Sequence, residues 1–272
     1  MEGTKNYIVC FIDILGYKNI VLNDDEVVLS SVKEALDNAV FKLLKFIKEY
    51  KPSDNLPENE EQFISGTYES INIDVISDSI IIRMPLELES NTINVIKLWS
   101  FLFYVSFLIA NFIYLTGLFI RGGISFGTHF ECPINDETQN NFIFSKTLIQ
   151  AYLLEKKAES IRILIDEPIV EYIKADKVMT GKYKNSDFLY QDVDKLHCLH
   201  FYRVISDKDS MYVFFPEYRR HIIKNITDNR HDIRVISKYV NLIKYHNDYM
   251  KSIKYDFNFI DGNILVLNPN DK

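Results

Sequence analysis

The sequence contains few of the residues that mark special structural classes. Its 272 residues include 3 cysteines, 9 glycines and 7 prolines. So little glycine and proline excludes collagen-like and low-complexity chains, and 47% hydrophobic residues exclude large-scale disorder. Cys10, Cys132 and Cys198 are an odd number without a C-x-x-C pair, so neither a disulfide framework nor a zinc ribbon fits. A cytoplasmic location is therefore expected.

Positive charge is also scarce. The chain carries 31 basic against 38 acidic residues, a net charge of -7 and a pI near 5.4. Because binding to nucleic acid requires a basic face that neutralises phosphates, no nucleic-acid partner is expected. The amino-terminal residues lack the basic and apolar pattern of a secretory signal.

One long uncharged run, Leu98–Ile120, is long enough for a membrane span. The alternative is a buried helix that ends near Thr116 and Gly117, followed by a strand that starts at Leu118. Polar residues inside the run and the absence of a strong flanking positive cluster favour the buried helix. No membrane span is expected, although a membrane-anchored protein stays open as an alternative.

Apolar patterns predict alternating strands and helices. The run Tyr7–Leu15 is apolar apart from Asp13 and is typical of a strand buried on both faces. From Val27 to about Tyr50 the pattern indicates an amphipathic helix. The sequence further predicts a loop over 51–66, two strands within Ser70–Met84 joined by a turn at Ser77–Ser79, a strand over Leu118–Gly127, a loop over Cys132–Asn141, a helix from the capping Ser145 to about Ala158, and a strand over Ile161–Asp166.

The carboxyl-terminal part, from about Ile169, contains helical patterns and an aromatic segment, Leu199–Ile205, which we predict as a strand. No linker divides the chain and no internal repeat is visible. We therefore expect one domain with a carboxyl-terminal helical extension.

Asp13 is a charged residue inside a buried strand. Burying an unpaired carboxylate costs several kcal/mol, so Asp13 requires a cation, hydrogen bonds or water. It either bonds to backbone amides of the turn at Leu15–Tyr17 or acts together with Asp78, which is itself a common turn residue. Two carboxylates that converge from adjacent strands can hold Mg²⁺ or Mn²⁺, which activate an attacking oxygen and stabilise a leaving one.

Arg121 opens a glycine-rich segment, Arg121–Gly127, which matches neither a P-loop nor a dinucleotide fingerprint. An arginine beside a phosphate site can stabilise charge during phosphoryl transfer. The alternative is an ordinary ion pair with a helix carboxylate. Glu155–Lys157 is interpreted as a solvated helix face, and His197 and His200 are interpreted as non-ligating. We find no nucleophile elbow and no partner for a catalytic cysteine.

Taken in order, four motifs resemble those of class III nucleotidyl cyclases, and more narrowly those of the pyrimidine cyclases of bacterial Pycsar antiphage systems. The motifs are Phe11–Gly16 (FIDILG), Ser77–Ser79 (SDS), Arg121–Gly127 (RGGISFG) and Ala151–Glu155 (AYLLE), within a match over about residues 7–167. The resemblance implies an α+β fold with a central, mostly antiparallel sheet flanked by helices. It implies a catalytic core over residues 1–168 and an extension over 169–272.

The resemblance also implies a metal and triphosphate site. Asp13 and Asp78 are then the ligands of two divalent metal ions, Mn²⁺ or Mg²⁺, and the backbone carbonyl of Ile14 adds a further ligand. The amides from Leu15 to Lys18, which include those of Gly16 and Tyr17, are expected to hold the triphosphate of the substrate.

Two further roles follow from the same resemblance. Arg121 is the catalytic arginine that stabilises charge on the α-phosphate, and Tyr68 contacts the base. Purine-converting relatives carry an asparagine and an arginine on the helix with the fourth motif, where this chain has Ile149 and Leu153. That departure favours the pyrimidine branch, or else a non-catalytic nucleotide-binding protein with a cyclase fold.

The implied reaction converts UTP into 3′,5′-cyclic UMP and pyrophosphate, with CTP and cyclic CMP as the alternative. The chain contains one copy of each motif, so a site shared between protomers implies a homodimer. The implied partner of the product is an effector that is activated by the cyclic nucleotide during antiphage defence.

Overall fold

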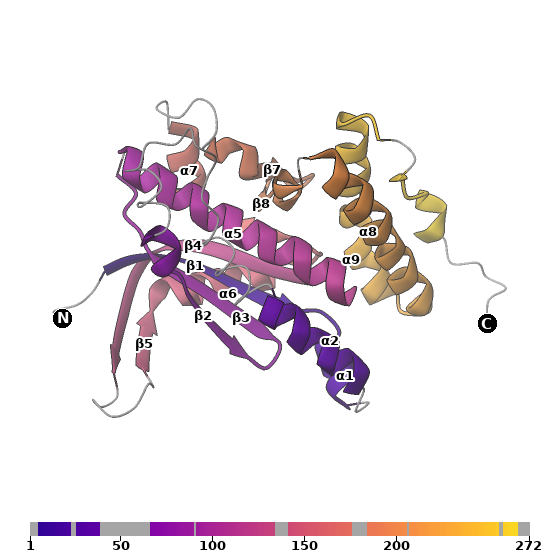
Figure 1. Cartoon of the computed structure of the whole chain (residues 1–272), viewed down its shortest axis with the longest axis horizontal. Helices are drawn as coiled ribbons and strands as arrows, with labels where there is room; N and C mark the ends of the chain where they lie inside the picture. Colours follow the sequence, from indigo (N-terminus) through magenta and orange to yellow (C-terminus); the bar gives the residue numbers. More distant parts are fainter. Residues whose placement is uncertain are drawn as a thin grey trace.

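A computed structural model of the chain describes residues 5–22, 26–38, 66–89, 91–133, 141–175, 184–205, 207–255 and 258–265. They contain one eight-stranded sheet in the order β2-β3-β1-β4-β6-β8-β7, with β5 paired to β4 (Figure 1). The strands are β1 (Lys5–Ile14), β2 (Asn72–Ile76), β3 (Ser79–Pro85), β4 (Ile120–Pro133), β5 (Asn141–Ser145), β6 (Ile163–Ile165), β7 (Leu189–Gln191) and β8 (His197–Leu199). All pairings are antiparallel except that of β4 with β6, which confirms the expected mostly antiparallel sheet.

Helices lie on both sides of this sheet; most are interleaved with its strands along the chain, and two follow the last strand. The α-helices are α1 (Tyr17–Leu22), α2 (Glu26–Leu36), α5 (Thr92–Thr116), α6 (Lys146–Ala158), α7 (Glu167–Ala175), α8 (Lys208–Asp228) and α9 (Ile233–Ser252). Short 3₁₀ turns are η2 (Asn185–Phe188), η3 (Phe201–Val204) and η5 (Gly262–Leu265). The expected α+β class and the carboxyl-terminal helices are confirmed.

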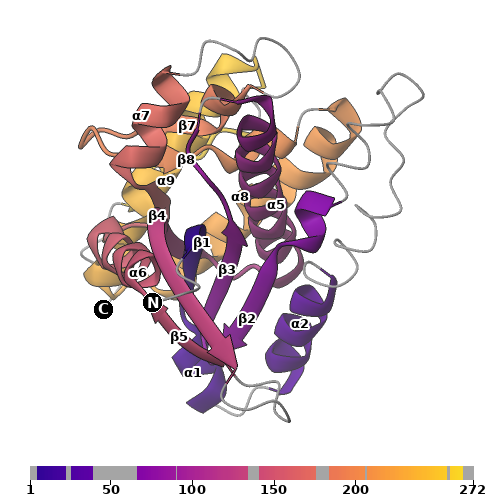
Figure 2. The same cartoon turned by 90° about the vertical axis from the view of Figure 1, so that its left-hand side faces the viewer.

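The central strand β1 separates two hydrophobic layers because side chains alternate along a strand. Ile8, Cys10 and Ile12 belong to the main core with α2 and α5, whereas Val9 and Phe11 pack against α6 on the other face. Figure 2 shows α6 on one side of the central strands and α5 and α2 on the other. Asp13 shares the α6 face with Val9 and Phe11.

Helix α5 accounts for the long uncharged run. The side chain of Asn91 caps its first turn, and Gly117 ends it in the left-handed conformation, with φ of 68°. By length and hydropathy, which averages 1.8 in its most apolar window, α5 is a candidate membrane span, but 67% of that window is buried within the protein. Its buried side chains join the main core, so α5 serves as the core helix of this fold, as the sequence favoured.

The prediction of a strand over Leu199–Ile205 is wrong. Strand β8 ends at Leu199, and η3 follows, closed by bonds from the amide of Arg203 to the carbonyl of His200 and from Ile205 to Tyr202. Consecutive residues of a strand point to opposite faces, whereas Phe201 and Tyr202 are both buried in the same core. Burial of both rings on one side therefore favours the turn.

The prediction of a loop over Cys132–Asn141 is also wrong at both ends. Strand β4 continues to Pro133, and Asn141 begins β5, which pairs with it as far as His129 and Ser145. Phe130 of β4 contacts the ring of Phe144 of β5 across the ladder, a cross-strand contact that stabilises such pairs. Residues 134–140 and 39–65 lie outside the described part of the chain. The predicted helix from Val27 to about Tyr50 is present in its first part as α2, and its remainder falls within 39–65, as does nearly all of the loop 51–66.

Candidate active site

Asp13 and Asp78 lie at the same end of the central strands. In the antiparallel ladders of β1, Asp13 pairs with Ser79 of β3 on one side and with Arg121 of β4 on the other. The amide of Ile14 donates to the backbone carbonyl of Asp78 at 2.8 Å, which fixes the hairpin turn beside the end of β1. The two aspartates therefore sit on adjoining backbone segments.

Local sequence explains both bends at this end of the sheet. The turn between β2 and β3 consists of Ser77 and Asp78, and Ser77 adopts a φ of 57°, a conformation that a short polar residue tolerates. After β1, Gly16 has a φ of 84°, which favours glycine, and α1 begins at the next residue, Tyr17. A sharp turn thus follows Asp13 in the chain, and the turn of the neighbouring hairpin lies at the same end of the sheet.

One of the backbone amides predicted to bind the triphosphate already has a partner in the protein. The amide of Leu15 donates to the carbonyl of Phe119 at 2.9 Å, so it is not available to a ligand. The amides of Gly16, Tyr17 and Lys18 lie at the start of α1, where helix geometry offers no acceptor within the helix. The set of amides that the resemblance assigns to the triphosphate is therefore reduced to these three.

Arg121 bridges two carboxylates. Its Nε donates to Oδ2 of Asp13 at 3.2 Å and lies 2.6 Å from Oε1 of Glu155 on α6. The side chains of Arg121 and Asp13 retain 19% and 20% exposure, whereas that of Glu155 has none. The ion pair with a helix carboxylate, one of the two expected roles of Arg121, is thus present, and the requirement of Asp13 for a cation is met from within the chain.

The interpretation of Glu155 as part of a solvated face is wrong. Glu155 is fully buried, and its neighbour Lys156, half exposed, places Nζ 3.3 Å from Oε2 of Glu155. Helix α6 lies close on β4 because Gly123 has no side chain. A Cβ at Gly123 would lie 2.4 Å from the carbonyl oxygen of Ala151. The stripe that could have revealed this inward face is Thr147, Ala151, Glu155 and Ala158, whose members recur every three or four residues and are all buried.

The donor set at this site fits hard divalent cations. Asp13 and Asp78 supply carboxylate oxygens, the ligands that Mg²⁺ and Mn²⁺ prefer, and Asp13 retains partial access to solvent. Within the described residues no group of three or more potential metal-ligating side chains occurs, so two carboxylates and backbone oxygens are what the chain offers. Such a site is completed by substrate oxygens and water.

Tyr68 and the two altered helix positions lie in different environments. Tyr68 is 3% exposed and belongs to the main core of the protomer. Ile149 and Leu153 on α6 are instead exposed, at 61% and 57%. The exposed apolar positions of α6 therefore face away from the sheet, on the side opposite to Glu155.

The described cysteines do not supply a nucleophile. Burial raises the pKa of the Cys10 thiol above its usual range, and burial raises that of Cys198 to about 12. Reactive cysteines require the thiolate form, which these environments disfavour.

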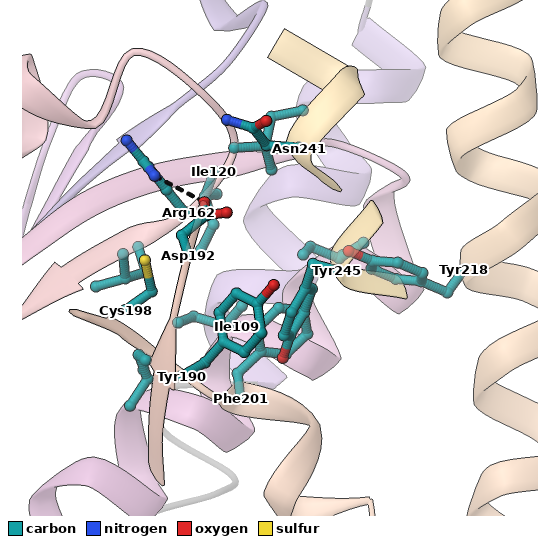
Figure 3. Close-up of a pocket in the computed structure, with 14 residues that line it drawn as sticks. Ile109, Ile120, Arg162, Tyr190, Asp192, Cys198, Phe201, Tyr218, Asn241 and Tyr245 are labelled. Atoms are coloured by element: carbon teal, nitrogen blue, oxygen red, sulfur yellow. Dashed lines mark hydrogen bonds and ion pairs between the residues drawn. The ribbon is translucent and has the colours of Figure 1, made fainter. Parts of the chain in front are cut away.

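Hollows in the described part of the protein differ in volume and in lining residues. A cavity of about 30 Å³ lies between the sheet and α9, lined by aromatic rings and by the ion pair of Arg162 and Asp192 (Figure 3). It has room for about one or two water molecules. A hollow of about 410 Å³ lies among α1, α2 and β2, lined in part by Tyr17, Lys33 and Ser77, and neither Asp13 nor Asp78 lines it. The second has the size of a small-molecule site, as does a hollow of about 450 Å³ between α5 and α8.

Comparisons with known proteins find similarity of fold. No family model matches the chain, and no curated protein matches it. The structure is similar to the guanylyl cyclase domain of the RhoGC fusion protein from the aquatic fungus Blastocladiella emersonii, with a TM-score of 0.45, 14% identity, and coverage of 73% of this chain and 96% of that one.

Two further solved structures are similar. The guanylate cyclase domain of RhGC from Catenaria anguillulae, in complex with GTP, has a TM-score of 0.43, 13% identity, and coverage of 71% of this chain and 93% of that one. A bacterial light-regulated adenylyl cyclase has a TM-score of 0.44, 11% identity, and coverage of 81% and 59%. At these TM-scores and identities the similarities carry no argument about the reaction or the substrate.

Proposed function

We propose that the protein is a nucleotidyl cyclase that acts on a pyrimidine nucleoside triphosphate. The observation that carries this proposal is the placement of Asp13, Asp78 and Arg121 at one end of three adjacent strands. Two carboxylates and an arginine side by side form a site for a polyphosphate with its divalent cations. The order of the four sequence motifs supports cyclisation as the reaction.

In the proposed reaction the ribose 3′-oxygen forms a bond to the α-phosphorus, and the bond from that phosphorus to the bridging oxygen of pyrophosphate breaks. The 3′-hydroxyl releases its proton to water, and the products are the 3′,5′-cyclic monophosphate and pyrophosphate. Asp13, Asp78 and the backbone carbonyl of Ile14 would hold the cations, which supply charge neutralisation and an acidified hydroxyl when bound. Arg121 stabilises charge on the α-phosphate, and the amides of Gly16 and Tyr17 bind the triphosphate.

The proposed preference for a pyrimidine substrate is based on two residues of α6. Ile149 and Leu153 occupy the positions at which purine cyclases carry asparagine and arginine, and neither side chain can hydrogen-bond a ribose or phosphate. UTP is the proposed substrate and CTP the alternative, and Tyr68 is the proposed contact to the base. Because Tyr68 is buried in the protomer, contact with a ligand would require its hydroxyl to reach the edge of the core.

The experiment is a comparison of four substrates. The protein is incubated with UTP, CTP, ATP or GTP and Mn²⁺, and the products are separated by mass spectrometry. We expect cyclic UMP, or cyclic CMP, together with pyrophosphate. Purine cyclic products alone, or only linear products, would contradict the proposal.

A non-catalytic nucleotide-binding protein is the second candidate, favoured by the engagement of Arg121 with Asp13 and Glu155. The variant Asp78→Asn separates the two. An enzyme loses nearly all turnover while its circular dichroism spectrum and melting temperature stay near those of the native chain. A binding protein shows no turnover in either form and at most weaker cation-dependent binding.

A homodimer with a shared site is part of the proposal. Four large apolar side chains are exposed near α6 and β5, which suits a protein interface: Phe144, Ile149, Tyr152 and Leu153. Mixing Asp13→Ala protein with an α6 variant should restore turnover, because one of two hybrid sites is intact. No recovery despite proven subunit exchange, or turnover by a verified monomer, would contradict the shared site.

The proposed role is synthesis of a second messenger in the cytoplasm during antiphage defence. It rests on the resemblance, and the partner is an effector activated by the cyclic pyrimidine nucleotide. Expression of this gene with its neighbours in a phage-challenged host tests the role, and absence of both protection and an adjacent cyclic-nucleotide-binding effector would count against it.

A further inference from the structure

The guanidinium of Arg121 is shared unequally between its two carboxylates. Its Nε–H has hydrogen-bond geometry toward Oδ2 of Asp13, at 3.2 Å. Glu155 is nearer, with Oε1 at 2.6 Å from the same nitrogen, yet neither oxygen of Glu155 has a hydrogen-bond donor among the described residues. The nearer carboxylate is therefore held by charge alone.

The carboxylate without the hydrogen bond, that of Glu155, is the more deeply buried of the two. The side chain of Asp13 is one-fifth exposed, so water or a cation can replace Arg121 there. Glu155 is fully buried, and loss of its cation would leave an unpaired charge away from water, which is strongly unfavourable. Contact with Asp13 is thus exchangeable, whereas contact with Glu155 is the one that the protein must keep.

The other cation near Glu155 is a poor substitute. Lys156 Nζ lies 3.3 Å from Oε2, but its side chain is half exposed, and it also lies over the ring of Tyr152. A solvated lysine contributes little to an ion pair. Arg121 is therefore the main compensating charge for Glu155.

The remaining nitrogens of Arg121 are uncommitted. In the described part of the chain, no protein acceptor pairs with Nη1 or Nη2, so the outer edge of the guanidinium is open. A guanidinium held by its Nε can still present two terminal amines to an anion.

We infer that Glu155 is a positioning residue onto which Arg121 transfers its Nε hydrogen bond when a divalent cation binds Asp13. The inference rests on the proposed function, since it concerns the same site. The transfer replaces one charge-assisted hydrogen bond with another and supplies Glu155 with the donor that it lacks. Arg121 then stays beside the site when Asp13 is occupied, with its terminal amines free.

The test follows the Nε–H signal of Arg121 by nuclear magnetic resonance in the full chain with isotope-labelled arginine. Titration with Mg²⁺, without nucleotide, should shift this signal saturably, and Asp13→Asn should abolish the shift. Glu155→Gln should weaken Mg²⁺ binding by about fivefold or more, because Arg121 then lacks its second anchor. Arg121→Met should tighten it, because the competing cation is gone.

A matched control addresses simple structural damage. Asp192→Asn neutralises another buried carboxylate that is paired with an arginine of the same sheet, and it should leave the Arg121 signal and Mg²⁺ binding unchanged. Should Arg121→Met fold poorly, Arg121→Met with Glu155→Gln removes both charges and gives the same comparison.

Equal Mg²⁺ affinity in Glu155→Gln and native protein, or an Arg121 signal that does not respond to saturating Mg²⁺, would overturn the inference. Turnover of UTP and CTP is measured on the same samples. Turnover without a shift of Arg121 retains the proposed function and removes this inference, and a shift without turnover does the reverse.

Discussion

Two arginines of the sheet, Arg121 on β4 and Arg162 just before β6, are each paired with two carboxylates in different ways. Arg162 is fully used, since its Nε donates to the carbonyl of Ala158 at 3.0 Å and its terminal nitrogens donate to Asp192 at 2.7 Å and to Asp194 at 2.6 Å. Figure 3 shows the pair with Asp192 at the edge of the small cavity. Burial acts to lower the pKa of Arg162, but the hydrogen bonds with the two aspartates raise it overall.

Arg121 is used at one nitrogen. Among the described residues its Nε alone contacts carboxylates, and its buried partner Glu155 lacks a hydrogen bond. A fully satisfied buried network rigidifies a fold, whereas a partly satisfied one marks a place where a ligand can complete the set. Arg162 therefore serves structure, whereas Arg121 is available for function.

Replacing each arginine by methionine should give the largest and most different effects. Arg162→Met leaves Asp192 buried without its cation, and we expect a loss of about 3–5 kcal/mol in the free energy of unfolding. Turnover per folded molecule should stay unchanged. Arg121→Met should lose about 100-fold or more in turnover, and added Glu155→Gln should restore stability without restoring turnover. Urea unfolding and product formation on the same samples measure both, and equal losses of turnover in the two variants would refute the comparison.

The pH dependence of stability should come from the Arg162 side of the molecule, where α8 and α9 cover the sheet. His246 is fully buried, accepts from the Tyr202 hydroxyl at Nδ1 and donates from Nε2 to the carbonyl of Asn258, an atom that can only accept. Burial lowers the pKa of His246 to about 4, and burial likewise lowers that of His200 to about 4.

The unfolded chain then binds more protons than the folded one between the unfolded pKa near 6.5 and about 4. Stability contributed by neutral His246 is complete above that window and falls as the pH falls through it, by about 3 kcal/mol. Urea midpoints measured from neutral to acidic pH should show this slope, and Arg121→Met should keep it. His246→Gln retains the acceptor and the donor, so its slope should be smaller, and an unchanged slope would assign the effect elsewhere.

The sequence predicted the central elements because their signals are local. The apolar run around Asp13 predicted β1, and the serines and aspartate at 77–79 predicted the turn between β2 and β3. Helix α5 ends at Thr116, where the sequence predicted its end. The pairing of β4 with β5 was not predicted because Pro133 and Asn141 are residue types common in loops. The turn η3 was not predicted because its aromatic residues have strand propensity. Pairing with β4 decided the strand β5, and burial of Phe201 and Tyr202 decided the turn η3.

The site was predictable only in part, because its partners lie far apart in the chain. Asp13, Asp78 and Arg121 were selected from sequence position and resemblance, and the register pairs Asp13 with Arg121 on one side and with Ser79, the residue after Asp78, on the other. The burial of Glu155 depends on Gly123 allowing α6 onto β4, a contact that no local pattern encodes. Sequence reasoning treated Glu155 by its charge, although its helical spacing from Ala151 indicated the inward face.

A smaller change sharpens the account of the Arg121 side. In Gly123→Ala the new methyl group would meet the carbonyl of Ala151 and the Cβ of Leu154, each at 2.4 Å, so α6 must move off β4. We expect a cost of about 1–3 kcal/mol in stability. Glu155 moves with α6, so turnover should fall as well. Gly66→Ala, whose methyl group would enter open space, is the control, and equal turnover in both variants would show that α6 does not position Arg121.

The smallest effect is expected at the exposed partner of Arg162. The Asp194 side chain is 39% exposed, against 6% for Asp192, so water can replace its ion pair when Asp194 becomes asparagine. We expect Asp194→Asn to cost about 0–1 kcal/mol in unfolding free energy.

The pH dependence of that cost has a definite sign. The hydrogen bond from Arg162 lowers the pKa of Asp194, so its contribution is present above the unfolded pKa and fades as acid protonates the folded carboxyl. The native chain and Asp194→Asn should therefore differ at neutral pH and converge in acid, whereas Asp192→Asn should cost more because that carboxylate is buried. A cost at Asp194 equal to that at Asp192 would show that the Arg162 network depends on the number of its bonds rather than on their burial, and burial would then no longer separate the two arginines.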